Sequence, residues 1–210
     1  PMSNIAIIFA RGGSKGLPNK NIKKIDNKPL IYYSIKLAKS CSFIKDVYIS
    51  TDNKKIKDIS LRYGAKIIDR PKNLATDKSP EFLAWKHAVK FLKKKGIGFK
   101  KIISLPTVAP VRIKSDIRLA IKSLDKDTDM IISVTESKHY PEFNMVTIDK
   151  KGFCSLLKKK KKKIARRQDS IPLFNIVPTV YVTTPEFILN NSNMFDGKVK
   201  AIHIPEDRAV

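Results

Sequence analysis

The sequence predicts a doubly wound α/β fold with a mostly parallel sheet. Two observations support this class. Short apolar runs rich in isoleucine, such as residues 4–9, are typical of strands buried on both faces of a parallel sheet. These runs alternate with amphipathic stretches from residue 4 to residue 135. Such alternation is built with helical crossovers, and these are right-handed in nearly all known cases.

Each element of the first half has its own signal. Pro29 suits the first turn of a helix that ends near Cys41. Asp52 is a candidate N-cap for the next helix, and Gly64 closes it. Ser79, followed by Pro80 and Glu81, predicts a third helix that ends before Gly96. Between these helices we expect strands at 46–50 and 65–69.

The second half continues this pattern and then departs from it. Strands are expected at 101–105 and 129–135, around a helix with Ile117, Ala120, Ile121 and Leu124 on its inner face. Residues 144–157 predict a hairpin, and 158–172 a solvated, positively charged connection. A strand then leads to a helix capped by Thr184 with Pro185 in its first turn, and 198–205 form the last strand. We expect one domain over 1–210, with 137–180 inserted.

Composition favours a globular, soluble protein. The 210 residues are 42% hydrophobic and 8% aromatic, enough for a sizeable core. No apolar run approaches the roughly 20 residues that span a bilayer, and the N-terminal residues show no secretion signal. Cys41 and Cys154 are far apart in the sequence, which favours a reducing compartment. A cytoplasmic location is the expectation.

The formal charge of +24, from 43 Lys and Arg against 19 Asp and Glu, favours anionic partners. The excess of positive charge has an alternative explanation, in which an AT-rich coding sequence places lysines on solvated helix surfaces without any functional role. The lysine run 158–163 has no interleaved aromatic residues for stacking on bases. We therefore expect a solvated loop there, and neither nucleic acid nor a membrane as partner.

The most informative stretch is "IAIIFARGGSKGLPNKN", residues 5–21. It contains three glycines and three cations, Gly12, Gly13, Gly16, Arg11, Lys15 and Lys20. Ligands of open α/β sheets bind beyond the carboxyl ends of strands, where this loop is expected. Glycines bring backbone N–H groups close to a phosphate, and cations neutralise it. The spacing matches neither G-x-G-x-x-G nor the P-loop. A basic turn without a ligand is the alternative.

The same stretch carries a resemblance to a known family. "ARGGSKGLPNKN" resembles the signature of the acylneuraminate cytidylyltransferases, the CMP-sialic acid synthetases. Further segments agree in order: "YISTD" at 48, "RPKNLATD" at 70, "PTVAPVR" at 106, "RRQ" at 166 and "YVT" at 181. The resemblance implies a nucleotidyltransferase-like, Rossmann-like fold. It also implies that the protein activates a nonulosonic, sialic-type acid with CTP, giving a CMP-sugar and pyrophosphate.

The resemblance also implies roles for particular residues. Those matching the CTP site are Arg11, Gly12, Gly13, Ser14, Lys20, Asn21, Arg70 and Asp77. Arg11 and Lys20 are the expected catalytic cations. Those matching the sugar site are Arg167, Gln168, Tyr181 and Phe195. A guanidinium such as that of Arg167 suits a carboxylate because it can donate two parallel hydrogen bonds.

Mg²⁺ is the cofactor that the resemblance implies. The aspartate pair that holds it in the family would fall just beyond Val210, so no residue of 1–210 is assigned as a metal ligand. Either the sequence is a piece of a longer protein, which we expect, or the protein lacks these ligands. The inserted segment 137–180 resembles the family's dimerisation segment. We therefore expect a homodimer in which Phe195 reaches the partner's sugar pocket.

Three positions depart from the sialic acid enzymes toward apolar residues: Leu105, the Val177–Pro178 pair, and Phe143. Sites with unpaired polar groups reject ligands strongly, so an apolar pocket favours a substrate with deoxy or acyl-bearing carbons. We expect a legionaminic or pseudaminic acid relative. The alternatives are a nonenzymatic nucleotide- or anion-binding relative that has lost the metal aspartates, a nucleic-acid binder, and a transferase for the Kdo sugar.

Overall fold

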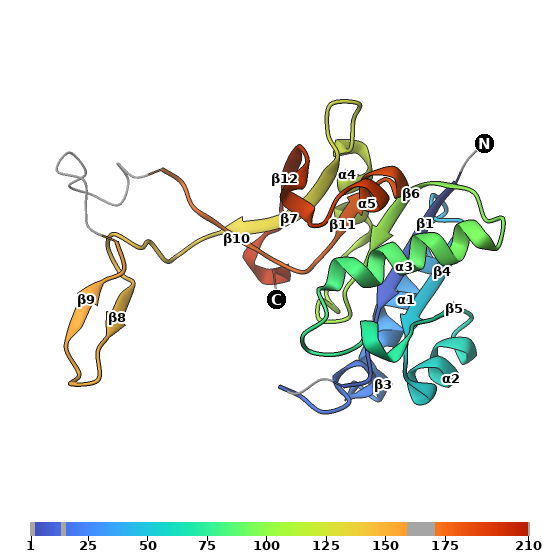
Figure 1. The fold of residues 1–210 in the computed structure, drawn as a ribbon, viewed down its shortest axis with the longest axis horizontal. Coiled ribbons are helices and arrows are strands. Elements are labelled where there is room, and N and C mark those ends of the chain that lie inside the picture. The colour runs from blue at the N-terminus through green and yellow to red at the C-terminus, as the bar shows by residue number, and fades with distance from the viewer. Residues whose placement is uncertain (1–2, 14–15, 159–170, 210) are drawn as a thin grey trace.

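The computed structural model describes residues 3–13, 16–158 and 171–209. An eight-stranded sheet with the order β10-β7-β11-β6-β1-β4-β5, and with β12 paired to β7, forms its centre (Figure 1). Its strands are β1 (Ser3–Phe9), β4 (Asp46–Thr51), β5 (Lys66–Asp69), β6 (Phe99–Ser104), β7 (Met130–Glu136), β10 (Phe174–Ile176), β11 (Tyr181–Thr183) and β12 (Val199–His203). Every strand expected from the isoleucine-rich runs is present.

The sheet is mostly parallel, as predicted. β1 pairs in parallel with both β4 and β6, β4 with β5, and β12 with β7. β11 runs antiparallel between β6 and β7, and β10 runs antiparallel to β7. Ile5, Ile7 and Ile8 of β1 are at most 1% exposed, because helices cover both faces of this strand.

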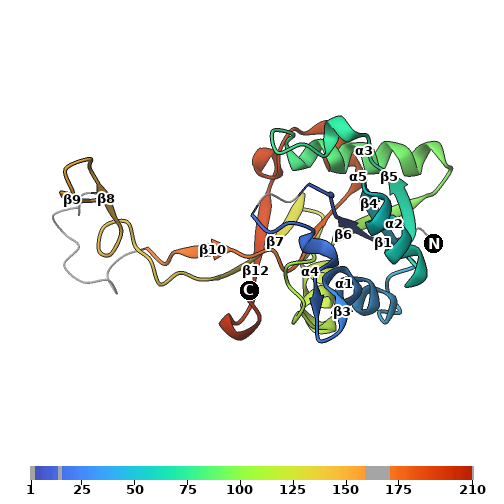
Figure 2. The ribbon, with the colours of Figure 1, turned by 90° about the horizontal axis from the view of Figure 1, so that it is seen from below.

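Helices lie on the two faces of the sheet, which confirms the doubly wound fold (Figure 2). One face is covered by α1 (Leu30–Lys39), α2 (Lys54–Arg62) and α4 (Lys114–Ser123), and the other by α3 (Glu81–Lys94) and α5 (Pro185–Asn190). Ile35, Ile56 and Ile117 belong to the first core, and Trp85 and Phe187 to the second. Fully burying one such side chain contributes about 1.5–3 kcal/mol.

Three of the predicted helix starts need correction. Pro29, predicted in the first turn of α1, is instead its N-cap and the last residue of β3. Asn53, and not Asp52, is the N-cap of α2, and its side chain accepts a hydrogen bond from the Ile56 amide at 3.1 Å. β4 continues through Thr51, which shifts the start of the helix by one residue. Pro80, and not Ser79, is the N-cap of α3, without a side-chain cap. The predicted Thr184 cap of α5 is confirmed.

A long arm projects from the body in both views (Figures 1 and 2). It carries the hairpin of β8 (Val146–Ile148) and β9 (Cys154–Leu156), which confirms the hairpin prediction. A small second hairpin joins β2 (Lys24–Ile25) to β3 (Lys28–Pro29) through Asp26 and Asn27, both left-handed. The described residues also form short single-turn helices: η1 (Lys20–Ile22), η2 (Lys72–Leu74), η4 (Met194–Asp196) and η5 (Glu206–Arg208). Within the described ranges, no helix is both long and apolar enough to cross a membrane.

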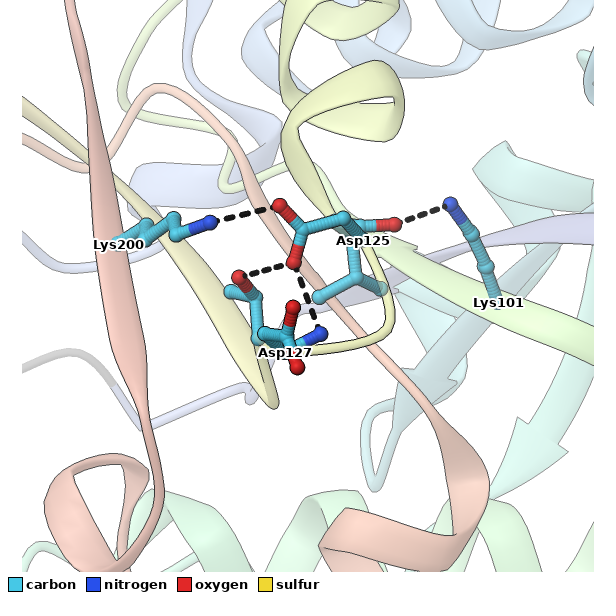
Figure 3. Close-up of polar contacts among 6 residues, drawn as sticks. Lys101, Asp125, Asp127 and Lys200 are labelled. Atoms are coloured by element: carbon cyan, nitrogen blue, oxygen red, sulfur yellow. Dashed lines mark hydrogen bonds and ion pairs between the residues drawn. The ribbon is translucent and has the colours of Figure 1, made fainter.

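Asp125 organises the connection from α4 to β7 (Figure 3). Its carboxylate pairs with Lys200 of β12 at 2.6 Å and accepts a hydrogen bond from the Asp127 amide at 3.0 Å. Lys101 of β6 donates to the Leu124 carbonyl at 2.9 Å, at the end of α4. The Lys200 contact is the largest cause that lowers the pKa of Asp125 to about 2. Two strands are thereby tied to one turn.

Candidate active site

A cleft of about 370 Å³ opens beyond the carboxyl ends of β1, β5 and β6. It is lined by Phe9, Arg11, Lys20, Asn21, Arg70, Leu74, Thr76, Asp77, Ser79, Glu81, Pro106, Thr107, Val108, Pro178 and Tyr181. β11 adds Tyr181 at the same edge, because this strand is antiparallel and Tyr181 pairs with Ser104, the last residue of β6. The site therefore lies where parallel sheets commonly bind ligands.

The loop after β1 is held by carboxylates. Arg11 forms an ion pair with Asp77 at 2.7 Å, and the Gly12 amide donates to Asp52 Oδ1 at 2.9 Å. Gly12 also lies directly against Asn53, since a Cβ built on Gly12 would lie 2.6 Å from Asn53 Nδ2. Gly12 is thus needed for a close approach to the start of α2. Its amide is already occupied by Asp52.

Asn21 links this loop to the loop after β6. Its side chain is 6% exposed, and its Nδ2 donates to the Arg11 carbonyl at 3.0 Å. Its Oδ1 accepts a hydrogen bond from the buried Thr107 hydroxyl at 2.6 Å. Lys20 is next to Asn21 in η1 and lines the cleft. The bridge by Asn21 therefore fixes the backbone of Arg11 relative to Thr107.

Arg70 forms part of the cleft floor. Its Nε donates to Ser50 Oγ at 3.1 Å and its Nη2 to the Ser50 carbonyl at 2.7 Å. The guanidinium lies 5.8 Å from the centre of the Phe9 ring, which itself stacks on Trp85 at 5.1 Å. Burial lowers the pKa of Arg70, and the nearby carboxylates of Asp52 and Glu81 oppose this shift. The two hydrogen bonds to Ser50 anchor the guanidinium to β4.

Tyr181 of β11 also lines the cleft. Its ring meets Trp85 edge to face with a centroid distance of 6.3 Å. Burial, together with the charge of Glu81, raises the pKa of Tyr181 to about 12. The phenol is therefore protonated at neutral pH and can donate a hydrogen bond. Glu81 accepts a hydrogen bond from Trp85 Nε1 at 3.4 Å, so the aromatic cluster also orients a carboxylate.

The buried side chain of Arg112 holds the loop after β6 through hydrogen bonds to its backbone carbonyls. It is 4% exposed, and its guanidinium donates to the Ala109 carbonyl at 2.9 Å and to the Pro106 carbonyl. Burial lowers its pKa to about 9, opposed by Asp116. Asp116 also pairs with Arg208 of η5 at 2.9 Å. These contacts hold the loop that presents residues 106–108 to the cleft.

The structure brings half of the sequence-predicted site residues together. Those that line one cleft are Arg11, Lys20, Asn21, Arg70, Asp77 and Tyr181. Gly12 and Gly13 belong to the same loop but are not among the lining residues. Phe195 lies in η4, is 60% exposed, and is also not among them. Ser14, Arg167 and Gln168 lie outside the described residues.

Several cleft residues were not singled out from the sequence. Ser79 lines the cleft, and its buried hydroxyl has no hydrogen-bond partner among the described residues. Glu81 and Thr107 are also lining residues, and Thr107 lies in the segment "PTVAPVR" that the resemblance covers. Of the predicted apolar replacements, Leu105 and Val177 lie in the core and not in the cleft lining, and Phe143 is not among the lining residues. Only Pro178 reaches it.

The cleft contains two carboxylates, those of Asp77 and Glu81. Within residues 3–13, 16–158 and 171–209, no group of three His, Cys, Asp or Glu side chains is placed to hold a metal ion. The two lining carboxylates, Asp77 and Glu81, each contact another side chain, Arg11 and Trp85 respectively. No described residue is therefore assigned as a Mg²⁺ ligand.

Solved structures define the class of fold. CMP:2-keto-3-deoxy-manno-octonic acid synthetase complexed with CTP shares it with a TM-score of 0.68 at 15% identity, covering 96% of this chain and 90% of that one. A 4-diphosphocytidyl-2C-methyl-D-erythritol synthase gives a TM-score of 0.69 at 9% identity, covering 99% and 92%. The predicted nucleotidyltransferase-like fold is confirmed.

Sequence comparison defines the family. The family model for cytidylyltransferases matches residues 5–94 of this chain. The post-translational flagellin modification protein B of Campylobacter coli is 30% identical over 209 residues, covering 97% of this chain and 86% of the relative. The chain therefore belongs to the cytidylyltransferase family of nucleotidyltransferases, as the resemblance implied.

Other relatives carry names that specify a substrate. A pseudaminic acid cytidylyltransferase of Campylobacter jejuni is 27% identical over 207 residues, covering 98% of this chain and 89% of the relative. An N-acylneuraminate cytidylyltransferase of Streptococcus agalactiae is also 27% identical, over 209 residues. That alignment includes 98% of this chain, which spans about half, 49%, of the length of this relative.

Proposed function

We propose that this protein transfers CMP from CTP to a nonulosonic acid and releases pyrophosphate. The observation that carries the proposal is the convergence of Arg11, Lys20, Asn21 and Arg70 on one cleft at the carboxyl edge of the sheet. Three cations suit a triphosphate, since charge-assisted hydrogen bonds are the stronger class. Membership of the cytidylyltransferase family supports CTP as the nucleotide.

In this proposal the anomeric hydroxyl of the sugar attacks the α-phosphorus of CTP. The bond from that phosphorus to the bridging oxygen breaks, pyrophosphate leaves, and the proton of the attacking hydroxyl is released to solvent. Arg11 and Lys20 neutralise the charge that develops on the phosphate oxygens. Arg11 exchanges its 2.7 Å contact with Asp77 for the phosphates when CTP binds. Catalysis then depends on positioning and charge more than on covalent chemistry.

The sugar is proposed to occupy the end of the cleft lined by Tyr181 and Pro178. The protonated phenol supplies a donor, while Pro178 presents no hydrogen-bond donor and favours a deoxy or acyl-bearing carbon. A legionaminic or pseudaminic acid is therefore the proposed substrate class. Names of relatives support this choice, although an N-acylneuraminate enzyme is equally similar.

Pyrophosphate release from CTP with a panel of sugars tests this proposal. The protein is incubated with CTP and, in separate reactions, pseudaminic acid, legionaminic acid, N-acetylneuraminic acid and Kdo. We expect turnover with pseudaminic or legionaminic acid and a lower kcat/KM for N-acetylneuraminic acid. A clear preference for N-acetylneuraminic acid or Kdo contradicts the substrate class, and no turnover with any of the four contradicts the reaction.

We also propose a homodimer formed through the arm. Apolar side chains gather on it without cover: Val146, Ile148, Phe153, Ile171 and Phe174 are all at least 51% exposed. Exposed apolar patches of this kind support a protein contact. Phe195, which is 60% exposed, is proposed to contact the partner's sugar pocket. Light scattering at micromolar concentration is expected to give the dimer mass, and a monomer contradicts this part.

Mg²⁺ remains the proposed cofactor, and no step is assigned to it because no described residue is assigned as its ligand. Loss of pyrophosphate release in EDTA, with recovery on adding Mg²⁺, is the expected result. We infer a cytoplasmic location from the two free cysteines, Cys41 and Cys154, and from the proposed use of CTP. Fractionation of expressing cells checks this inference.

A further inference from the structure

The antiparallel ladder beside β7 is interrupted by an irregular bulge between β10 and β11. β10 ends in the pair of Ile176 with Val134, and β11 resumes with Val182 opposite Ile131. Between these pairs, five residues, 177–181, face only two residues of β7. Bulges redirect side chains and occur frequently next to functional sites. This one lies where the chain passes the cleft, since Pro178 and Tyr181 line it.

The hydroxyl of Ser133 lies at the centre of this bulge. Ser133 is 0% exposed. Its Oγ donates to the Val177 carbonyl at 2.7 Å and accepts from the Val180 amide at 3.1 Å and the Thr179 amide at 3.3 Å. A serine hydroxyl has one hydrogen and two acceptor positions, so its whole capacity is used within the bulge.

No other residue type of this size can do the same. An alanine at 133 would leave the buried Val180 amide without this partner, and a buried unpaired amide is costly. The Val177 carbonyl would keep only its hydrogen bond from the Thr179 amide at 2.8 Å. Val177 and Val180 are themselves at most 7% exposed, so water cannot readily replace the hydroxyl. The backbone would then be expected to shift its register on β7, and Tyr181 would move with it.

We propose that Ser133 is a positioning residue for the sugar end of the cleft. Its hydroxyl holds segment 177–181 in the bulged form that turns Pro178 and Tyr181 toward the cleft. The inference rests on the proposed function, which assigns this end of the cleft to the nonulosonic acid. Ser133 itself touches neither substrate nor the reacting atoms in this account.

The single tryptophan offers a direct readout. Trp85 contacts the Tyr181 ring at 6.3 Å, so its emission reports the placement of Tyr181. Ser133→Ala is expected to shift the Trp85 emission and to raise its quenching by iodide. Ser60→Ala is the matched control, because Ser60 is also 0% exposed but its hydroxyl contacts the Ile56 carbonyl in α2. The control is expected to leave the emission unchanged.

Kinetics separate positioning from a general loss of structure. Ser133→Ala is expected to raise KM for the nonulosonic acid about tenfold, the size of effect of one lost hydrogen bond, with KM for CTP changed less than twofold. A loss of folded enzyme would lower the apparent kcat and leave both KM values unchanged. The proposal is overturned if Ser133→Ala has the same KM for the nonulosonic acid and the same Trp85 emission as the unmodified protein.

Hydrogen exchange keeps the proposal falsifiable if Ser133→Ala does not fold. In the unmodified protein, the Val180 amide is expected to exchange slowly, because Ser133 Oγ accepts its hydrogen. Exchange as fast as in the exposed turn 150–152 overturns the proposal. A protein that transfers CMP to no sugar contradicts the proposed function, whereas the emission and exchange results still decide the role of Ser133 in placing Tyr181.

Discussion

The bridge formed by Asn21 gives the most quantitative test of the cleft. Asn21 joins the Arg11 carbonyl to the Thr107 hydroxyl through two hydrogen bonds, of 3.0 and 2.6 Å, and both Asn21 and Thr107 are at most 6% exposed. Asn21→Ala removes both bonds and leaves two partners unpaired. At about 1–2 kcal/mol for each lost hydrogen bond, the free energy of unfolding should fall by about 2–4 kcal/mol. Thr107→Val removes only one bond and should cost about 1–2 kcal/mol.

Because the two side chains share one hydrogen bond, their effects should not add. The double variant Asn21→Ala/Thr107→Val is expected to be more stable than the sum of single effects by about 1–2 kcal/mol. Urea denaturation measures the free energies of unfolding. Binding of CTP, measured by calorimetry, should weaken by about tenfold for each 1.4 kcal/mol that is lost in placing Arg11.

Thr128→Val is the matched control for this cycle. Thr128 is 5% exposed and donates to Asp125 Oδ1 at 2.7 Å, so it also loses one buried hydroxyl contact, but it does not line the cleft. It should lose similar stability with no change in the Kd for CTP. Additive effects at Asn21 and Thr107, together with an unchanged Kd for CTP, would refute the reasoning.

Three further predictions concern residues around the sheet. The pKa of Asp125 lies below its ordinary value, at about 2, so the stabilising contribution of this carboxylate is complete above about pH 4 and is lost as the pH falls toward 2. The difference in free energy of unfolding between the unmodified protein and Asp125→Asn should therefore shrink over that range. A constant difference in urea denaturation argues against this prediction. Arg70→Lys removes a bidentate donor and should lower the free energy of unfolding by about 1–3 kcal/mol, whereas an unchanged midpoint would show that the contacts with β4 are unimportant. Gly12→Ala should cost about 1–3 kcal/mol, because its Cβ would lie 2.6 Å from Asn53 Nδ2, while Gly13→Ala, with no atom within 4 Å, should be nearly neutral; equal effects in thermal melts contradict this packing.

Much of the fold could be predicted because local patterns and tertiary structure agree. The isoleucine-rich runs gave strands on their own, since a strand buried on both faces must be apolar throughout. Exceptions occur where neighbouring residues compete. Asp52 and Asn53 are both good N-caps, and only the extent of β4 decides between them. β10 is three residues long and exposed, so its pairing with β7 leaves no periodic signal.

The site was predicted in its composition more than in its geometry. Arg11 and Lys20 stand out because cations and glycines follow a strand. That Gly12 contacts Asn53, or that Leu105 points into the core, depends on contacts between distant segments. The role of Ser133 depends on a residue 44 positions away, Val177, and a single serine within a strand gives no sequence signal for it.

Binding of CTP to the cleft is the central claim, and the shift of the melting temperature by CTP tests it most directly. At 100 times Kd, a ligand stabilises by about 2.7 kcal/mol, which corresponds to about 5–10 °C for a chain of this size. We expect that shift in the unmodified protein and in Lys24→Ala, an exposed control, and a much smaller one in Arg11→Ala and Lys20→Ala. An absent shift in the unmodified protein, or an equal shift in all four, contradicts the account.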